Sequence, residues 1–251
     1  LYNKGLYKQS LKLLDKAKNL ALKNEEKYTA FEIVELEKLI ESQYITRSMS
    51  NRTEVLISDS NLLIKQNNIA SMLSNLSLEL YERLIKTGYA KSDEEFREIT
   101  RFFFERMPKI SVVNLGFREK LWYNKVHLWY SLLIQDFLSS YKYAMKWVDM
   151  FNKQPEMIIS HPVFYLKGNN YLMESLLLIK YPAKFRDILK KLTLNIESLS
   201  FPKNDNIEAL SFLYYYNNRI NLYFLEGDFK KGLSLIETIN YKINQLKDRI
   251  D

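Results

Sequence analysis

The stretch that decides the fold is Gly5-Leu6-Tyr7-Lys8-Gln9-Ser10, which recurs near the other end of the chain as Gly227-Asp228-Phe229-Lys230-Lys231-Gly232. Both copies have a small residue, an aromatic residue two positions later and a second small residue three positions after that. We expect the first small residue to end one helix and to let the chain reverse. The aromatic side chain then packs back on the preceding helix, and the second small residue allows close approach. The motif therefore predicts pairs of helices in tandem.

The same pattern recurs between these two copies at nearly equal steps. Its six anchors are Gly5, Ser50, Glu94, Ser139, Ala183 and Gly227. Successive anchors are 44 or 45 residues apart, and the copy at Ser50 is weak because Arg52 and Asp59 break its pattern. Self-similarity at a fixed period is typical of helical-repeat proteins. We call the helix before an anchor the first helix of its pair and the helix after it the second.

Apolar residues at helical spacing predict a helix in each of eleven segments. These are Leu6–Leu22, Glu25–Tyr44, Asn51–Lys65, Ile69–Lys86, Ser92 to just before Pro108, Phe117–Phe137, Ser140–Asn152, Val163–Ile179, Ala183–Leu199, Asp205–Leu225 and Asp228–Lys247. Ser92 and Glu95 form a capping box at the start of one of them. Pro108, Pro155 and Pro202 should each lie just past a second helix. With six glycines and five prolines, the chain has few residues for tight turns, and no strand is predicted.

The anchor motif resembles the second helix of the tetratricopeptide (TPR) repeat, and Gly5, Tyr7, Leu14 and Ala17 match it best. The Trp, Leu-Gly and Tyr residues of a TPR first helix are missing, and a TPR is only about 34 residues long. HEAT-type repeats, which have nearer the observed period, remain the alternative. The resemblance implies an all-α fold, a right-handed α-α superhelix (TPR-like solenoid) of about five to six antiparallel helix pairs. The resemblance covers most of the chain, and we expect residues 1–251 to form a single TPR-like domain, part of a longer chain if further domains flank it.

Composition restricts the partners and the compartment. The net charge is +7, but Lys and Arg are interleaved with Asp and Glu, and no basic block marks a nucleic-acid arm. The absence of cysteine excludes disulfides and thiolate metal sites and fits a reducing compartment, so we expect a cytoplasmic protein. The apolar runs are far shorter than a membrane span, and we expect no membrane partner. Because the chain begins at Leu1 rather than Met, we expect a leader or an earlier domain before it.

No pattern of catalytic or cofactor-binding residues is found. His127 and His161 are far apart in the sequence and lack metal-ligand spacing, and the few glycines form no phosphate-binding loop. We interpret His127, which lies among Trp122, Trp129 and Tyr130, as a core or wall residue, and His161 as part of a helix start. We therefore predict no catalytic residue, no cofactor and no metal. An enzyme with an unfamiliar site would have His127 as its one candidate.

The resemblance implies that first helices line a concave binding wall. Counting back from the anchors gives the candidate binding residues Trp129, Tyr130, Asn170, Glu174, Tyr214, Asn217, Asn218 and Asn221. An Asn side chain both donates and accepts hydrogen bonds and can hold a peptide backbone. The predicted function is a non-catalytic protein- or peptide-binding scaffold. The alternative is binding of single-stranded nucleic acid through a basic, aromatic-lined face.

Overall fold

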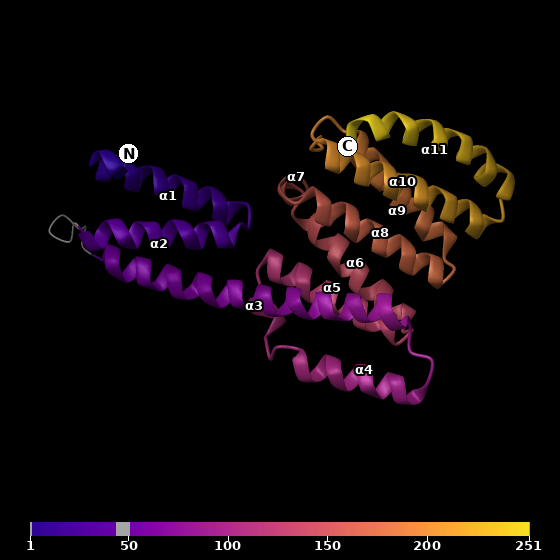
Figure 1. Cartoon of the computed structure of the whole chain (residues 1–251), viewed down its shortest axis with the longest axis horizontal. Coiled ribbons are helices and arrows are strands. Elements are labelled where there is room, and N and C mark those ends of the chain that lie inside the picture. Colours follow the sequence, from indigo (N-terminus) through magenta and orange to yellow (C-terminus); the bar gives the residue numbers. More distant parts are fainter. Residues whose placement is uncertain (1, 44–50, 251) are drawn as a thin grey trace. The chain divides into compact units, whose positions relative to one another are not determined.

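The computed structural model describes residues 2–43 and 51–250, with the side chains of residues 245–250 left out (Figure 1). Its α-helices are α1 (Tyr7–Lys23), α2 (Lys27–Gln43), α3 (Arg52–Thr87), α4 (Asp93–Arg106), α5 (Phe117–Leu133), α6 (Phe137–Lys153), α7 (Glu156–Ser160), α8 (Pro162–Leu178), α9 (Pro182–Glu197), α10 (Asp205–Glu226) and α11 (Phe229–Ile250). The described residues contain no strand, so the all-α prediction is confirmed for them. The weak anchor Ser50 lies outside the described residues.

Four hairpins between consecutive helices are closed by the same turn. In each, one residue takes a positive φ of 55–72°, and the next N–H donates back to a carbonyl five residues earlier, 2.8–3.0 Å away. The residues with positive φ are Glu25, Gln135, Lys180 and Gly227. This closure satisfies carbonyls that a helix end leaves unpaired. The anchor motif places it correctly at Gly227, whereas Ser139 and Ala183 lie inside helices that have already begun.

The prediction of two helices over Asn51–Lys65 and Ile69–Lys86 is wrong, because α3 is one continuous helix. The polar residues between the two segments include no glycine or proline that would stop a helix. Asn67 is buried, and its Nδ2 donates to the Lys27 carbonyl oxygen at 3.3 Å, while the Tyr28 hydroxyl donates to the Asn67 carbonyl oxygen at 3.2 Å. These residues attach α3 to α2 and do not interrupt it.

The helix ends predicted from prolines are confirmed, whereas the predicted helix Phe117–Phe137 ends at Leu133, before the turn at Gln135. Each of the three prolines at 108, 155 and 202 follows the end of a helix, namely α4, α6 and α9. One half of the capping box forms, because the Glu95 N–H donates to Ser92 Oγ at 3.2 Å; the Glu95 carboxylate accepts from the Lys91 N–H, at 2.6 Å, in place of the Ser92 N–H. The short helix α7, directly after Pro155, was not predicted.

The chain divides into two compact units, and the prediction of one domain over residues 1–251 stays a prediction. Unit 1 comprises residues 1–79 and 104–123. Its described part has an apolar core of Ala21, Ala30, Val34, Leu56 and Leu63. Buried charges in this unit are paired, as burial requires. Lys18 Nζ donates to the Glu37 carboxylate at 3.0 Å, and Lys27 Nζ donates to the Glu119 carboxylate at 2.9 Å.

Unit 2 comprises residues 80–103 and 124–251, and its helices pack chiefly on neighbours in the sequence. In Figure 1, α6 packs on α8, α8 on α9 and α10, and α10 on α9 and α11. The core includes the fully buried Trp147, Phe151 and Phe185. Gly168 of α8 lies directly against Trp147, because a Cβ added there would be 2.8 Å from the indole ring. None of the described helices is long and apolar enough to cross a membrane.

Candidate functional site

A row of aromatic rings crosses three helices of unit 2. The Tyr81 ring of α3 lies 5.0 Å from the Trp129 ring of α5, centroid to centroid. Trp129 in turn lies 5.2 Å from Tyr171 of α8, at an interplanar angle of 72°. The ring of Trp147, on α6, lies 5.7 Å from the Tyr171 ring, centroid to centroid. These separations and tilts are those of favourable aromatic pairs. Trp129 is buried and holds the row in place, while Tyr81 remains 43% exposed.

A chain of amide hydrogen bonds leads from α10 to a carboxylate on α8. Asn218 Nδ2 donates to the Tyr214 carbonyl oxygen at 2.8 Å and to Asn170 Oδ1 at 2.7 Å. Asn170 Nδ2 donates to Glu174 Oε1 at 2.7 Å. Both Asn side chains are buried, Asn218 completely. Their amide groups therefore connect the two helices and orient the Glu174 carboxylate.

Glu174 and Tyr81 lie close enough to Tyr171 and Tyr214 to affect the ionisation of these two tyrosines. Burial raises the pKa of Tyr171, and the charges of Tyr214, Glu174 and Tyr81 raise it further. Burial also raises the pKa of Tyr214, with contributions from Glu174 and Tyr81. The phenol groups of Tyr171 and Tyr214 are therefore neutral hydrogen-bonding groups at neutral pH. We call Tyr81, Trp129, Tyr171, Glu174 and Tyr214 the aromatic–carboxylate cluster.

The Glu174 carboxylate has no cationic partner among the residues whose side chains are described. Its one hydrogen bond there is from Asn170. Burial raises the pKa of Glu174, and the Asn170 hydrogen bond acts in the opposite direction. Half-buried between α8 and α10, the carboxylate is a hydrogen-bond acceptor without a counter-charge.

Two lysines lie one helical turn before the aromatic residues of the cluster. Lys125 precedes Trp129 by four residues on α5, and Lys167 precedes Tyr171 by four residues on α8, so each shares a helix face with its aromatic partner. Burial, together with repulsion from Lys167, lowers the pKa of Lys125 to about 8. The two ammonium groups are thus close to each other, and one of them is partly deprotonated near pH 8.

The structure brings together five of the eight predicted binding residues: Trp129, Asn170, Glu174, Tyr214 and Asn218. Asn217 is exposed and Asn221 half-buried, and neither forms a side-chain hydrogen bond with another described residue. Tyr130 lies elsewhere, stacked on Phe103 with centroids 4.1 Å apart.

Tyr81 and Tyr171 were missed by the sequence analysis. A signal for Tyr171 is present, because Trp129, Tyr171 and Tyr214 are 42 and 43 residues apart, close to the repeat period. All three lie on helices that precede an anchor. Tyr81 does not share this spacing, because it lies 48 residues before Trp129. It also lies within the continuous helix α3, where two separate helices were predicted.

His127 is packed between aromatic rings. Its imidazole stacks on Tyr143 with centroids 4.4 Å apart and meets Phe103 edge-on at 5.2 Å. Burial, and then the charges of Lys146 and Lys142, lower the pKa of His127 to about 4. The ring is therefore neutral at physiological pH. Among the described residues, no group of three or more His, Asp or Glu side chains is arranged to hold a metal ion.

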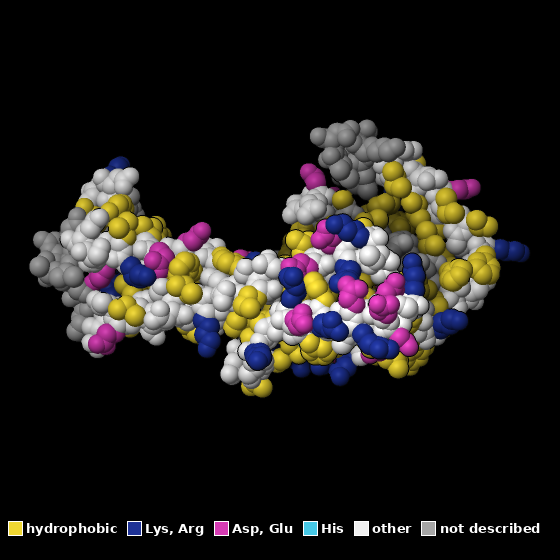
Figure 2. Space-filling model, turned by 60° about the horizontal axis from the view of Figure 1, so that its bottom comes forward, with side chains coloured by type: hydrophobic (Ala, Val, Ile, Leu, Met, Phe, Trp, Pro, Cys, Tyr) yellow, Lys and Arg dark blue, Asp and Glu magenta, His cyan; other side chains and the backbone are white. Residues whose placement is uncertain are grey.

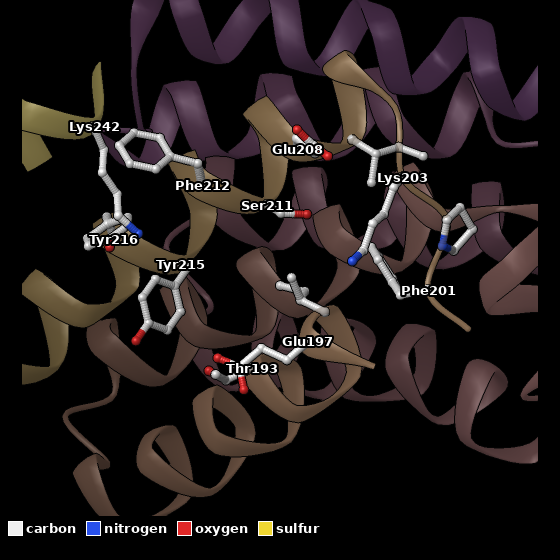
Figure 3. A pocket seen from close by; sticks show the side chains of 13 residues that line it. Thr193, Glu197, Phe201, Lys203, Glu208, Ser211, Phe212, Tyr215, Tyr216 and Lys242 are labelled. Carbon is white, nitrogen blue, oxygen red and sulfur yellow. The ribbon is translucent and has the colours of Figure 1, made fainter. Parts of the chain in front are cut away.

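A separate cavity of about 370 Å³ opens between α9, α10, α11 and the segment that joins α9 to α10 (Figure 3). Its size is at the lower end of the range for small-ligand sites. The lining is mixed: apolar and aromatic side chains alternate with Glu197, Lys203, Glu208 and Lys242. Figure 3 shows Lys242 beside Tyr216, and its Nζ lies 5.3 Å from that ring's centroid.

None of the predicted binding residues lines this cavity. The aromatic run at 214–216 is nevertheless divided between the two places. Tyr214 belongs to the cluster, and Tyr215 and Tyr216 line the cavity. Adjacent residues on a helix point about 100° apart, so three in a row cannot share one face.

Comparison with family models, with curated proteins and with solved structures finds no match. The resemblance to TPR proteins therefore rests on the anchor motif alone. Function is argued below from the side chains themselves.

Proposed function

We propose that this chain is a non-catalytic binding protein that holds a peptide segment of a partner protein against the aromatic–carboxylate cluster. The observation that carries the proposal is the convergence of Trp129, Tyr171 and Tyr214 from three successive first helices, α5, α8 and α10. A right-handed TPR-like superhelix of helix pairs would present these helices on its concave face.

The chemistry of the cluster suits a peptide. Tyrosine and tryptophan give large, rigid contact areas with a polar group at one end, and they are enriched among the residues that dominate binding energy. The neutral phenol groups of Tyr171 and Tyr214 both donate and accept hydrogen bonds, which an extended peptide backbone requires. Asn170 and Asn218 act behind this surface in the proposal, since their amides already bond within the protein.

Single-stranded nucleic acid is the alternative ligand, and the pair Lys125 and Lys167 beside Trp129 and Tyr171 favours it. Two observations favour the peptide over it. The lowered pKa of Lys125 weakens its attraction for phosphate. On the face shown in Figure 2, Lys and Arg side chains are interspersed with Asp and Glu. A fluorescent oligonucleotide titrated at low salt should show little binding, and tight, strongly salt-dependent binding would favour the alternative.

A peptide array tests the proposal, followed by fluorescence anisotropy with the selected peptides. Tyr81→Ala and Tyr214→Ala should each weaken binding about tenfold or more, as removal of a dominant interface side chain does. Tyr241→Ala is the matched control, because Tyr241 is 66% exposed on α11 and outside the cluster. An array without binders, or peptides that bind both cluster variants as tightly as the control, would refute the proposal.

A further inference from the structure

The Glu174 carboxylate is the one charged group of the aromatic–carboxylate cluster. It belongs to α8, its charge acts on Tyr171 and Tyr214, and no Lys or Arg among the described side chains forms an ion pair with it. In unit 1, by contrast, the buried carboxylates of Glu37 and Glu119 each form an ion pair with a lysine. A half-buried carboxylate held without a counter-charge is costly for the folded protein unless a ligand supplies one.

From this arrangement we infer that the cluster is a subsite for one cationic side chain, arginine or lysine, of the bound peptide. The inference rests on the proposed function and names the chemistry that the partner must present at this place. In this subsite Glu174 supplies the counter-charge, and the rings of Tyr81, Trp129 and Tyr171 form the aromatic wall that contacts the cation.

The hydrogen-bonding capacity of the cluster matches a cation. Asn170 donates to Glu174 Oε1, and Oε2 accepts no hydrogen bond from another described side chain, so it is available to a ligand. An ammonium has three N–H donors and a guanidinium has five. A charge-assisted bond to Oε2 and further bonds to the phenol oxygens of Tyr171 and Tyr214 would satisfy them.

The aromatic rings add an attraction that a neutral side chain lacks. A cation over the face of Tyr or Trp within about 6 Å of the ring centroid is drawn to it by the ring quadrupole. Tyr81, the most exposed ring of the row, can close over the cation while Trp129 remains fixed in the core. Partial burial also strengthens the charge interaction with Glu174 relative to one in water.

The test uses blocked arginine (Nα-acetyl-arginine amide) as the probe and blocked citrulline as its neutral isostere, each added to the full chain. The chain has three tryptophans, so their indole N–H signals in ¹⁵N NMR spectra can be assigned by single Trp→Phe variants. Millimolar blocked arginine should shift the Trp129 signal and saturate, whereas citrulline should not. Glu174→Gln keeps the acceptor for Asn170 and should weaken the response at least tenfold.

Glu237→Gln is the matched control, because it removes the same charge from an exposed position on α11 and should leave the response unchanged. The inference is overturned if the probe gives no response, if citrulline acts equally, or if Glu174→Gln responds like the control. Array peptides that need Tyr214 but no basic residue would overturn it and leave the proposed function standing. A Glu174-dependent response to arginine, together with an array that yields no peptide binder, would support the cation subsite and refute the proposed function.

Discussion

At the scale of single residues, Gly168 is a position where the packing of unit 2 leaves no room for a Cβ. Gly168→Ala would place a Cβ 2.8 Å from the Trp147 ring, which is fully buried and cannot yield. We expect the free energy of unfolding to fall by about 1–3 kcal/mol, the usual effect of overpacking a core. Urea denaturation measures the change.

Gly232→Ala is the control for that substitution, because Gly232 is also helical but an added Cβ would meet nothing nearer than 3.9 Å. Alanine is the better helix former, so this variant should gain about 0.5–1 kcal/mol. Equal effects of the two substitutions would show that the close contact of Gly168 with Trp147 is not a constraint.

His127 makes stability depend on pH. Its pKa is about 4 in the folded chain against an ordinary 6.5, so its contribution is complete above pH 6.5 and is lost as pH falls toward 4, where only the unfolded chain takes up the proton. His127→Gln should remove up to about 1.4 kcal/mol per pH unit from the slope in that window. The measurement is the difference between the pH–stability profiles of the two proteins. Parallel profiles would show that the pKa of His127 is the same in the folded and unfolded chain.

At the scale of elements, the hairpin turns carry strain wherever a residue other than glycine has a positive φ. Lys180, at 55°, is exposed and closes the turn between α8 and α9. Lys180→Gly should raise the free energy of unfolding by about 0.5–1 kcal/mol, the relief of strain less the entropy of glycine in the unfolded chain.

Gln135→Gly should gain less, because Gln135 Nε2 donates to the Ala90 carbonyl oxygen at 2.7 Å and that bond would be lost. Thermal denaturation of both variants compares them. A larger gain at 135 than at 180, or a loss at 180, would contradict this account of the turns.

The elements also show which features a sequence can predict. Prolines and the capping box at Ser92 act within a few residues, and the boundaries they predict are confirmed. The contact of Asn67 with Lys27 of α2, forty residues away in the sequence, could not be predicted from the local pattern. The sequence analysis predicted turns at small residues. Gln135 and Lys180 are not small, yet they take a positive φ, as Gly227 does.

At the scale of the whole molecule, the repeat period predicted much of the candidate site. Counting at the period of the anchors selected five residues of α5, α8 and α10 that belong to the cluster or to the hydrogen bonds behind it. The partnership of Tyr81 with them, and the interior position of Asn218, depend on how helices distant in sequence pack. The cavity near Tyr216 depends on the segment between α9 and α10, which has no periodic pattern.

Photocrosslinking tests the central claim, that a partner peptide lies on the aromatic–carboxylate cluster, most directly. A photoreactive benzoylphenylalanine replaces either Tyr214 in the cluster or Tyr241 on α11, and a peptide selected by the array is added before irradiation. Mass spectrometry should find the peptide attached through position 214, with unlabelled peptide suppressing the product, and little or none through position 241. Attachment through position 241 with none through position 214 would contradict the account.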